Sequence, residues 1–132
     1  IFPVYETEPV DAPAGSEAFL NAVVLIDTTL AANRLLDRAQ AIEDAFDRER
    51  TDVRNAPRTL DVDLIVVGDR RSHEDHLQLP HPRAAERAFV LKPWFDLEPD
   101  ASIPDFGPVA DLLATVGVDG LTLREDLTLA VE

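Results

Sequence analysis

The sequence predicts an α+β fold, and three features of the chain support that prediction. Two runs rich in valine and isoleucine, residues 19–26 and 59–67, have the composition of strands. Between them, apolar side chains recur at the spacing of an amphipathic helix. Strands and helices therefore alternate along a chain of 132 residues, of which 45% are hydrophobic, enough to build the core of one domain.

The N-terminal part contains the first strand and the first helix. Residues 3–13 are predicted to be a strand end and a loop, because three prolines interrupt regular structure. After the strand at residues 19–26, Thr28 or Thr29 can cap a helix that ends near Asp47. The apolar stripe of this helix consists of Leu35, Ala39, Ile42 and Phe46.

The central part holds the second clear strand. Residues 48–56 have no apolar periodicity and are expected to form an exposed loop before the strand at 59–67. A Gly-Asp pair at 68–69 then turns the chain. Residues 73–76 are predicted to be a polar loop whose two histidines are solvated, followed by a short extended segment at 77–79.

The C-terminal part is expected to return to helices and end in strands. Residues 84–97 predict one helix or two short pieces, in which Pro93 is tolerated only in a first turn while Trp94 and Leu97 pack inward. A turn at 104–108 precedes one or two helical turns at 109–114. Alternating apolar residues then predict a terminal hairpin: Leu121, Leu123, Leu127, Leu129 and Val131.

The charge balance restricts the kinds of partner. Twenty-six acidic and twelve basic residues give a formal net charge of -14, which argues against nonspecific binding to nucleic acid or to anionic membranes. No apolar run approaches the length of a membrane span, and the absence of cysteine fits the cytoplasm. We therefore expect neither nucleic acid nor a membrane as a partner, and the oligomeric state stays open.

Residues 58–63 are the most informative segment, because they place an arginine and two carboxylates at the start of a predicted strand. Successive strand side chains point to opposite faces, so Asp61 and Asp63 share a face and can bind hard cations together. The alternative is a solvated turn or a plain ion pair, since most charges are exposed. Six basic residues in the surrounding stretch indicate either an anion site or a solvated basic loop: Arg48, Arg50, Arg54, Arg58, Arg70 and Arg71.

Several motifs within residues 5–108 together resemble the signature regions of hydroxymethyl-dihydropterin pyrophosphokinases. Residues 5–9, Tyr-Glu-Thr-Glu-Pro, resemble the pterin loop of that family, and residues 19–22, Phe-Leu-Asn-Ala, resemble its Leu-Asn-Ala strand. Residues 40–43, Gln-Ala-Ile-Glu, with the Arg-x-Arg that follows, are similar to the helix end that contacts the nucleotide and to its basic loop. The most diagnostic motifs are Pro-Arg-Thr-Leu-Asp-Val-Asp at 57–63 and Pro80-His81-x5-Arg87-x-Phe89.

The resemblance implies a ferredoxin-like sandwich, in which helices pack on a mainly antiparallel sheet. Two features depart from the family pattern. Asn55 and Ala56 stand where the family most often has Trp-Gly, so that tryptophan cannot contribute to loop closure over the substrate. The family also has a strand, a Gly-Ser-Asn-type loop and a helix before the tyrosine motif, whereas this chain begins at Ile1 and has no methionine. We therefore expect residues 1–132 to be a single, N-terminally incomplete pyrophosphokinase domain.

The resemblance also implies that ATP binds together with two Mg²⁺ ions. Asp61 and Asp63 would hold the ions, because magnesium accepts few protein carboxylates and bridges phosphates. The catalytic set is then Arg48, Arg58, Asp61 and Asp63. The nucleotide would be bound by Gln40, Glu43, Arg58, His81 and Arg87. For the Gln40 and Glu43 pair the alternative is a solvent-facing role, and for His81 it is a structural hydrogen bond.

A pterin is a flat ring with a polar edge, so its site needs an aromatic face and a polar group that recognises the edge. By resemblance, Phe89 supplies the face and Asn21 the edge contacts, while Thr7 and Pro9 offer backbone contacts near the same ring. A core position is the alternative for Phe89. No residue stands out as a general base, and metal binding with positioning can activate the hydroxyl.

These expectations favour a folate-pathway transferase, a 2-amino-4-hydroxy-6-hydroxymethyldihydropteridine diphosphokinase, that moves pyrophosphate from ATP to 6-hydroxymethyl-7,8-dihydropterin and releases AMP. The main alternative is an inactive or degenerate ferredoxin-like binding or assembly module. A metal-dependent phosphohydrolase would also use two aspartates and arginines, but it gives no role to Asn21 and Phe89. Formation of AMP with a diphosphorylated pterin distinguishes the transferase from the binding module and from the phosphohydrolase.

Overall fold

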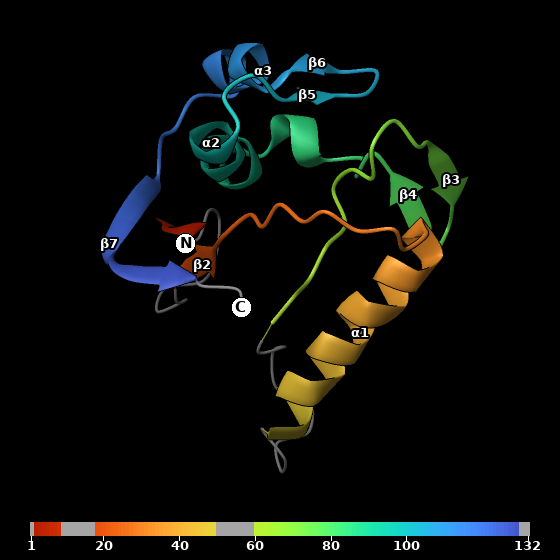
Figure 1. Ribbon diagram of the computed structural model, residues 1–132. Helices are drawn as coiled ribbons and strands as arrows, with labels where there is room; N and C mark the ends of the chain where they lie inside the picture. Colours follow the sequence, from red (N-terminus) through yellow and green to blue (C-terminus); the bar gives the residue numbers. More distant parts are fainter. Residues whose placement is uncertain (1, 9–17, 50–59, 130–132) are drawn as a thin grey trace. The chain divides into compact units, whose positions relative to one another are not determined.

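The computed structural model describes residues 2–8, 18–49 and 60–129 (Figure 1). The chain divides into two compact units. We call Ile1–Ile26 with Arg83–Glu132 the sheet unit, and Asp27–Pro82 the hairpin unit. The described residues combine helices with antiparallel sheets, which confirms the α+β class.

The sheet unit is built on three antiparallel strands in the order β2-β1-β7. Their bounds are β1 Phe2–Thr7, β2 Phe19–Asn21 and β7 Leu121–Leu129. The central strand β1 buries Val4 and Tyr5, as expected for a strand with a partner on either side. On β7, Arg124 binds Glu6 of β1 at 3.0 Å, which adds an ion pair to the β1–β7 ladder.

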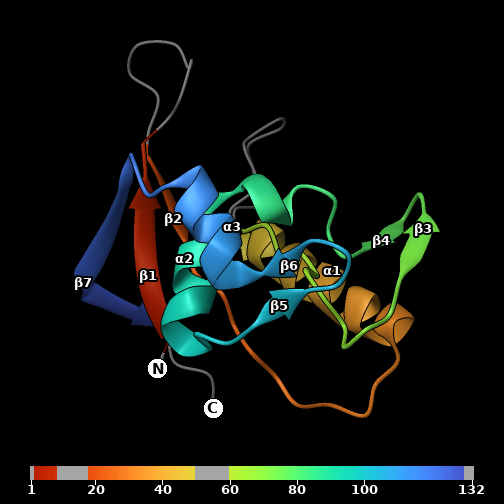
Figure 2. The same ribbon diagram turned by 90° about the horizontal axis from the view of Figure 1, so that it is seen from above.

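The helices of the sheet unit cover one side of this sheet. They are η1 Ala84–Glu86, α2 Ala88–Leu97 and α3 Val109–Val116, with a short hairpin of β5 Ser102–Ile103 and β6 Gly107–Pro108. Helix α2 packs against β1 and α3, and it lies between the sheet and α3 in both ribbon views (Figures 1 and 2). The buried core consists of Ala84, Val90, Leu91, Trp94, Ala101, Ile103 and Val109.

The hairpin unit joins one long helix to a two-stranded ribbon. Its elements are α1 Ala32–Glu49, β3 Ser72–Glu74 and β4 Leu77–Leu79, and the two strands pair in antiparallel. Ala32 of α1 and Leu77 and Leu79 of β4 form a buried cluster. Leu36, Leu64 and Val67 pack against it, so the segment before the hairpin is held by the same core.

The strand predicted at residues 59–67 is wrong for the residues that the structure describes. Residues 60–67 form no ladder with another strand in the described parts of the chain. Their backbone bonds go elsewhere: the Val62 N–H donates to a side chain of α1, and the Ile65 carbonyl accepts from the His81 N–H. The composition favoured an extended backbone, but a strand also requires a partner strand.

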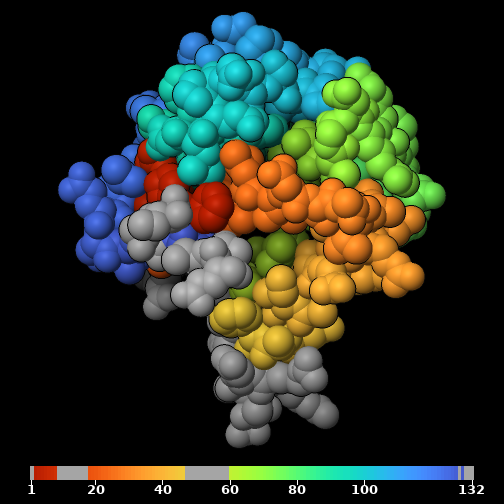
Figure 3. Space-filling view, viewed as in Figure 1, coloured from red at the N-terminus to blue at the C-terminus, as the bar shows by residue number. Residues whose placement is uncertain are grey.

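The first strand and helix are shorter or shifted relative to the prediction. The strand expected at 19–26 ends at Asn21 in β2, and α1 begins at Ala32 rather than after Thr28 or Thr29. The Thr28 hydroxyl instead accepts from the Leu30 N–H, 3.1 Å away, and so closes a turn before the helix. Leu35 and Ala39 are buried as predicted, but Ile42 and Phe46 are exposed, and Figure 3 shows this yellow end of α1 at the surface.

Three predictions for the remaining chain are also wrong. Residues 73–76, expected as a polar loop, lie in the β3–β4 hairpin. Pro93 lies inside α2 instead of in its first turn, and its burial in the core offsets the missing N–H bond. The terminal hairpin is one long strand, β7, because β1 supplies its partner with a register shift between Pro3 and Tyr5.

Other predictions are confirmed. Residues 84–97 form two helical pieces, with Trp94 buried, and residues 68–69 form a turn. The helical turns expected at 109–114 belong to α3. No helix in the described parts of the chain is long and apolar enough to cross a membrane.

Candidate functional site

Asp61 and Asp63 belong to the segment that precedes the β3–β4 hairpin. Asp61 and Asp63 are exposed, whereas Val62 between them is half-buried. This alternation is that of an extended backbone whose alternate side chains share a face. Both carboxylates are therefore exposed, in a segment that forms no ladder within the described parts of the chain, and their joint binding of cations stays a prediction.

The backbone between the two aspartates is attached to α1. The Val62 N–H donates to the Oε2 atom of Glu43, 2.8 Å away. Glu43 is half-buried and lies one turn beyond the buried Ala39, in the place where an apolar residue would continue the stripe of the helix. Gln40, by contrast, is exposed.

A cleft of about 330 Å³ runs beside this segment, within the hairpin unit. Asp63 and His81 both contribute to its wall, so the structure brings together two of the predicted site residues. The main chain of His81 is fixed by the 2.8 Å bond from its N–H to the Ile65 carbonyl. The full lining is Leu36, Val62, Asp63, Leu64, Asp75, His76, Leu77, Gln78, His81 and Pro82.

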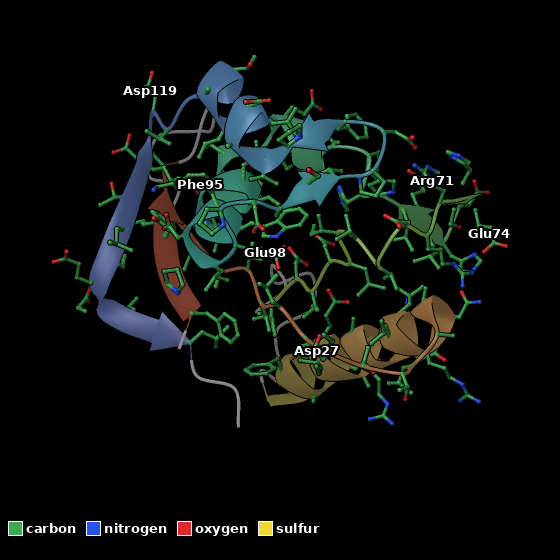
Figure 4. All side chains as sticks on the ribbon, turned by 45° about the horizontal axis from the view of Figure 1, so that its top comes forward. Asp27, Arg71, Glu74, Phe95, Glu98 and Asp119 are labelled. Atoms are coloured by element: carbon green, nitrogen blue, oxygen red, sulfur yellow. The ribbon has the colours of Figure 1, made fainter. Side chains whose placement is uncertain are left out.

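The sequence prediction missed the contribution of the hairpin to this cleft. His76 is exposed, as expected, and it also lines the cleft, where it lies 3.4 Å from the equally exposed Glu74 (labelled in Figure 4). Asp75 and Gln78 line the cleft as well. The alternation of Leu77, Gln78 and Leu79 after a polar pair is the signal that could have predicted a hairpin here.

The carboxylates fit a magnesium site that is completed by a ligand. Among the described residues, no group of three or more histidine, aspartate or glutamate side chains could hold a metal ion. Two exposed carboxylates are nevertheless enough for Mg²⁺, which keeps several waters and is commonly bound through one or two carboxylates plus substrate phosphates. Oxygen donors of this kind also suit its hard character.

In the sheet unit, Thr7 and Asn21 contact each other across the β1–β2 pair. Asn21 lies opposite Tyr5, so Thr7 is its diagonal neighbour, and the Nδ2 atom of Asn21 donates to the Thr7 hydroxyl at 3.1 Å. The hydroxyl also lies 3.4 Å from the carbonyl of Phe19. These bonds fix the orientation of the Asn21 amide. A side chain that recognises the polar edge of a ligand requires such a fixed orientation.

Arg87 and Phe89 form a second pair in the sheet unit, at the start of α2. The guanidinium carbon of Arg87 lies 5.4 Å from the centroid of the Phe89 ring, within the range of a cation–π contact. Both side chains are half-buried. Phe89 is therefore not part of the fully buried core, and its ring is available to a ligand from the partly exposed side.

Tyr5, the first residue of the tyrosine motif, connects β1 to α2. Its hydroxyl donates to the Oδ2 atom of Asp96, whose other oxygen is 2.8 Å from the ammonium group of Lys92. Burial, reinforced by the hydrogen bond and by the negative charge of Asp96, raises the pKa of Tyr5 well above its usual range. The start of the motif is thereby fixed to the helix that carries Phe89.

The predicted site residues are distributed over both units. Pro9, Arg58 and the side chain of Arg48 lie outside the part of the molecule that the structure describes. The described members of the metal and nucleotide set in the hairpin unit are Gln40, Glu43, Asp61, Asp63 and His81. The sheet unit contains Arg87 of the nucleotide set and the described members of the pterin set, which are Thr7, Asn21 and Phe89.

Comparison with known proteins gives consistent similarities. The family described as 7,8-dihydro-6-hydroxymethylpterin-pyrophosphokinase (HPPK) matches residues 1–99. A 2-amino-4-hydroxy-6-hydroxymethyldihydropteridine pyrophosphokinase of Pseudomonas aeruginosa is 40% identical over 121 residues, which cover 92% of this chain and 74% of that protein. The protein of the same name in Mycobacterium tuberculosis is 41% identical over 125 residues, covering 85% of this chain and 65% of its own length. A folate synthesis bifunctional protein of Arabidopsis thaliana is 40% identical over 94 residues, 71% of this chain and 19% of that protein.

Proposed function

The chain belongs to the 7,8-dihydro-6-hydroxymethylpterin-pyrophosphokinase family, and from this membership we propose that it transfers pyrophosphate from ATP to 6-hydroxymethyl-7,8-dihydropterin. The products are AMP and the pterin diphosphate, an intermediate of folate biosynthesis. Two partners follow from this activity, ATP and a dihydropterin. The names of the relatives support the reaction, and the residues described above support how this chain performs it.

The metal ions and most of the nucleotide contacts are assigned to residues of the hairpin unit, and Arg87 keeps the phosphate contact that its motif implies. The observation that carries the assignment is that Asp63 and His81 line one cleft while the backbone beside Asp63 is fixed to α1. Two Mg²⁺ ions held by Asp61 and Asp63, when bound, would neutralise and align the triphosphate. His81, Arg58 and Arg48 would donate to phosphate oxygens, and Gln40 and Glu43 are the further candidates near the nucleotide.

The pterin is assigned to the sheet unit. The Asn21 amide is oriented by its bond to Thr7, so its carbonyl oxygen and second N–H can pair with the donor and acceptor edge of a pterin. The half-buried Phe89 offers a ring face for stacking, and Arg87 lies over that ring. Thr7 and Pro9 complete the proposed contacts.

The fold and the cellular location follow from the same proposal. We propose a ferredoxin-like sandwich, which the antiparallel β2-β1-β7 sheet with α2 packed beside it supports. We propose the cytoplasm as the location, since ATP, the pyrophosphoryl donor of the proposed reaction, is present there.

The direct test is a product analysis with purified protein, ATP, Mg²⁺ and the dihydropterin. AMP should form only when both substrates and the metal are present, in an amount equal to the diphosphorylated pterin. Release of ADP or inorganic phosphate without a pterin product would instead indicate a phosphohydrolase. Binding of either substrate without turnover would indicate a noncatalytic binding module.

A further inference from the structure

We propose that Glu43 is a positioning residue for the metal-binding aspartates, and that it acts through the backbone of Val62 rather than by contact with the nucleotide. The inference rests on the proposed function, because it concerns the aspartates of the proposed magnesium site. It assigns to Glu43 a role different from the nucleotide contact that the motif suggested.

The carboxylate of Glu43 binds the main chain between the two proposed metal ligands. Its Oε2 atom accepts from the Val62 N–H at 2.8 Å. Val62 is the residue between Asp61 and Asp63, and consecutive Cα atoms are only about 3.8 Å apart. A single hydrogen bond therefore fixes the chain within one residue of both carboxylates, and Figure 1 shows residues 60–67 as an uncoiled run beside α1.

The segment depends on such a bond because residues 60–67 form no strand ladder within the described parts of the chain. A partly buried N–H without an acceptor is unfavourable. The position of Glu43 on α1 also accounts for an acidic residue where the buried stripe of Ala32, Leu35 and Ala39 would otherwise continue.

Direct contact between Glu43 and the nucleotide fits the structure less well. In the described part of α1, Leu36 lines the cleft, whereas Glu43 is not among the lining residues. Val62, Asp63 and Leu64 form the wall at that point. The carboxylate thus contacts the main chain of the segment that carries the aspartates, as expected for a group that orients metal ligands without touching the metal.

Three variants separate the effects of the length, the charge and the hydrogen-bonding capacity of the side chain at position 43. Glu43→Gln keeps an acceptor oxygen at the same reach, Glu43→Asp keeps the charge but shortens the side chain, and Glu43→Ala removes both. Asp37→Ala is the matched control, because it removes an exposed carboxylate from another face of the same helix. A cooperative thermal transition establishes which variants are folded, and Glu43→Asp remains informative if Glu43→Ala unfolds.

Two readouts do not depend on turnover. The first is hydrogen exchange of the Val62 amide, and the second is binding of Mn²⁺, followed by electron paramagnetic resonance, in the presence of a non-transferable ATP analogue. We expect Val62 exchange to accelerate in Glu43→Asp and Glu43→Ala, and Mn²⁺ affinity to fall about tenfold or more. Glu43→Gln and Asp37→Ala should stay close to the parent in both measurements. In turnover, the Mg²⁺ concentration for half-maximal rate should rise more than the KM for ATP at saturating Mg²⁺.

Three outcomes would overturn the proposal. Unchanged Mn²⁺ affinity in Glu43→Ala despite faster Val62 exchange would show that the bond does not position the aspartates. Equal losses in Glu43→Gln and Glu43→Ala would assign the effect to charge. A raised KM for ATP with an unchanged Mg²⁺ requirement would make Glu43 a nucleotide ligand. Failure of the parent to release AMP would refute the proposed function, while the exchange and Mn²⁺ measurements would still test Glu43.

Discussion

The guanidinium of Arg87 lies over the ring of Phe89, 5.4 Å from the ring centroid. The two residues were assigned to different substrates, Arg87 to the phosphates of ATP and Phe89 to the pterin ring. Their contact means that the cation and the aromatic face are held as one unit at the start of α2. Loss of either side chain is therefore expected to affect the other.

Phe89→Ala should weaken pterin binding more than ATP binding, because stacking on the ring contributes about 1 kcal/mol beyond burial. Arg87→Ala should weaken ATP binding and also weaken pterin binding by roughly two- to fivefold, since the ring loses a contact worth about 0.5–1 kcal/mol. Separate calorimetric titrations with each ligand measure both effects. Arg83→Ala, an exposed arginine paired with Glu86, is the control. Equal losses for the two ligands in Phe89→Ala would favour a packing role for the ring.

Asp61→Ala and Asp63→Ala should each abolish turnover while the protein stays folded. Both side chains are exposed, so their removal leaves the packing intact. Loss of one group that stabilises charge in the transition state typically costs about 3–4 kcal/mol, on the order of a hundredfold or more in rate. Steady-state AMP release by variants with unchanged thermal transitions tests this. Rates within a few-fold of the parent in both variants would exclude the magnesium assignment.

Tyr5→Phe should destabilise the protein at neutral pH, because it removes the hydrogen bond between the tyrosine hydroxyl and Asp96. A bond to a charged acceptor that is partly exposed is worth about 1–2 kcal/mol. Urea denaturation of the parent and the variant at pH 7 gives the difference in the free energy of unfolding. No difference would mean that this contact does not stabilise the β1–α2 packing.

The same pair of proteins should show a pH dependence with a definite sign. The pKa of Tyr5 in the folded protein is raised above its ordinary value of 10.0. Above that value the unfolded chain loses the tyrosine proton while the folded chain keeps it, so unfolding becomes more favourable as pH rises. The stability advantage of the parent over Tyr5→Phe should therefore be complete below about pH 10 and shrink above it. An advantage that grows in alkaline solution would contradict the assignment.

Leu79→Ala should destabilise the hairpin unit by about 2–5 kcal/mol, the usual cost of truncating a leucine in a core. Leu79 is 1% exposed and belongs to the cluster on which Leu64 and Val67 of the aspartate segment pack. His73→Ala, which truncates an exposed residue of the neighbouring strand, should change stability little. Denaturant titrations that show equal effects for the two variants would mean that this cluster is not a stabilising core.

The sequence predicted the features that depend on local periodicity. Helix α1 follows from its spaced apolar residues, and the two helical pieces around Arg87 follow from composition. The strand at 59–67 was wrong because its composition reports an extended backbone but not the presence of a partner. Ile42 and Phe46 were wrongly assigned to the buried stripe for a similar reason. Periodicity reports that residues share a face of a helix, but burial depends on what packs against that face.

The site was predicted by residue identity but not by contact. Motif order indicated Asp61, Asp63 and His81, and two of these three share a cleft in the structure. The bonds between Glu43 and Val62 and between Thr7 and Asn21 join residues 19 and 14 positions apart. Such pairs are formed by tertiary packing, so no local pattern in a single sequence reports them.

In the proposed reaction, this chain transfers both terminal phosphoryl groups of ATP together to a pterin hydroxyl. The most direct measurement uses ATP labelled in the β-phosphate, with Mg²⁺ and 6-hydroxymethyl-7,8-dihydropterin, and separates the products by chromatography. We predict that the label moves to the pterin, that unlabelled AMP forms in equal amount, and that Asp63→Ala abolishes both. Label retained in ADP, or released as inorganic phosphate while the pterin stays unmodified, would contradict it.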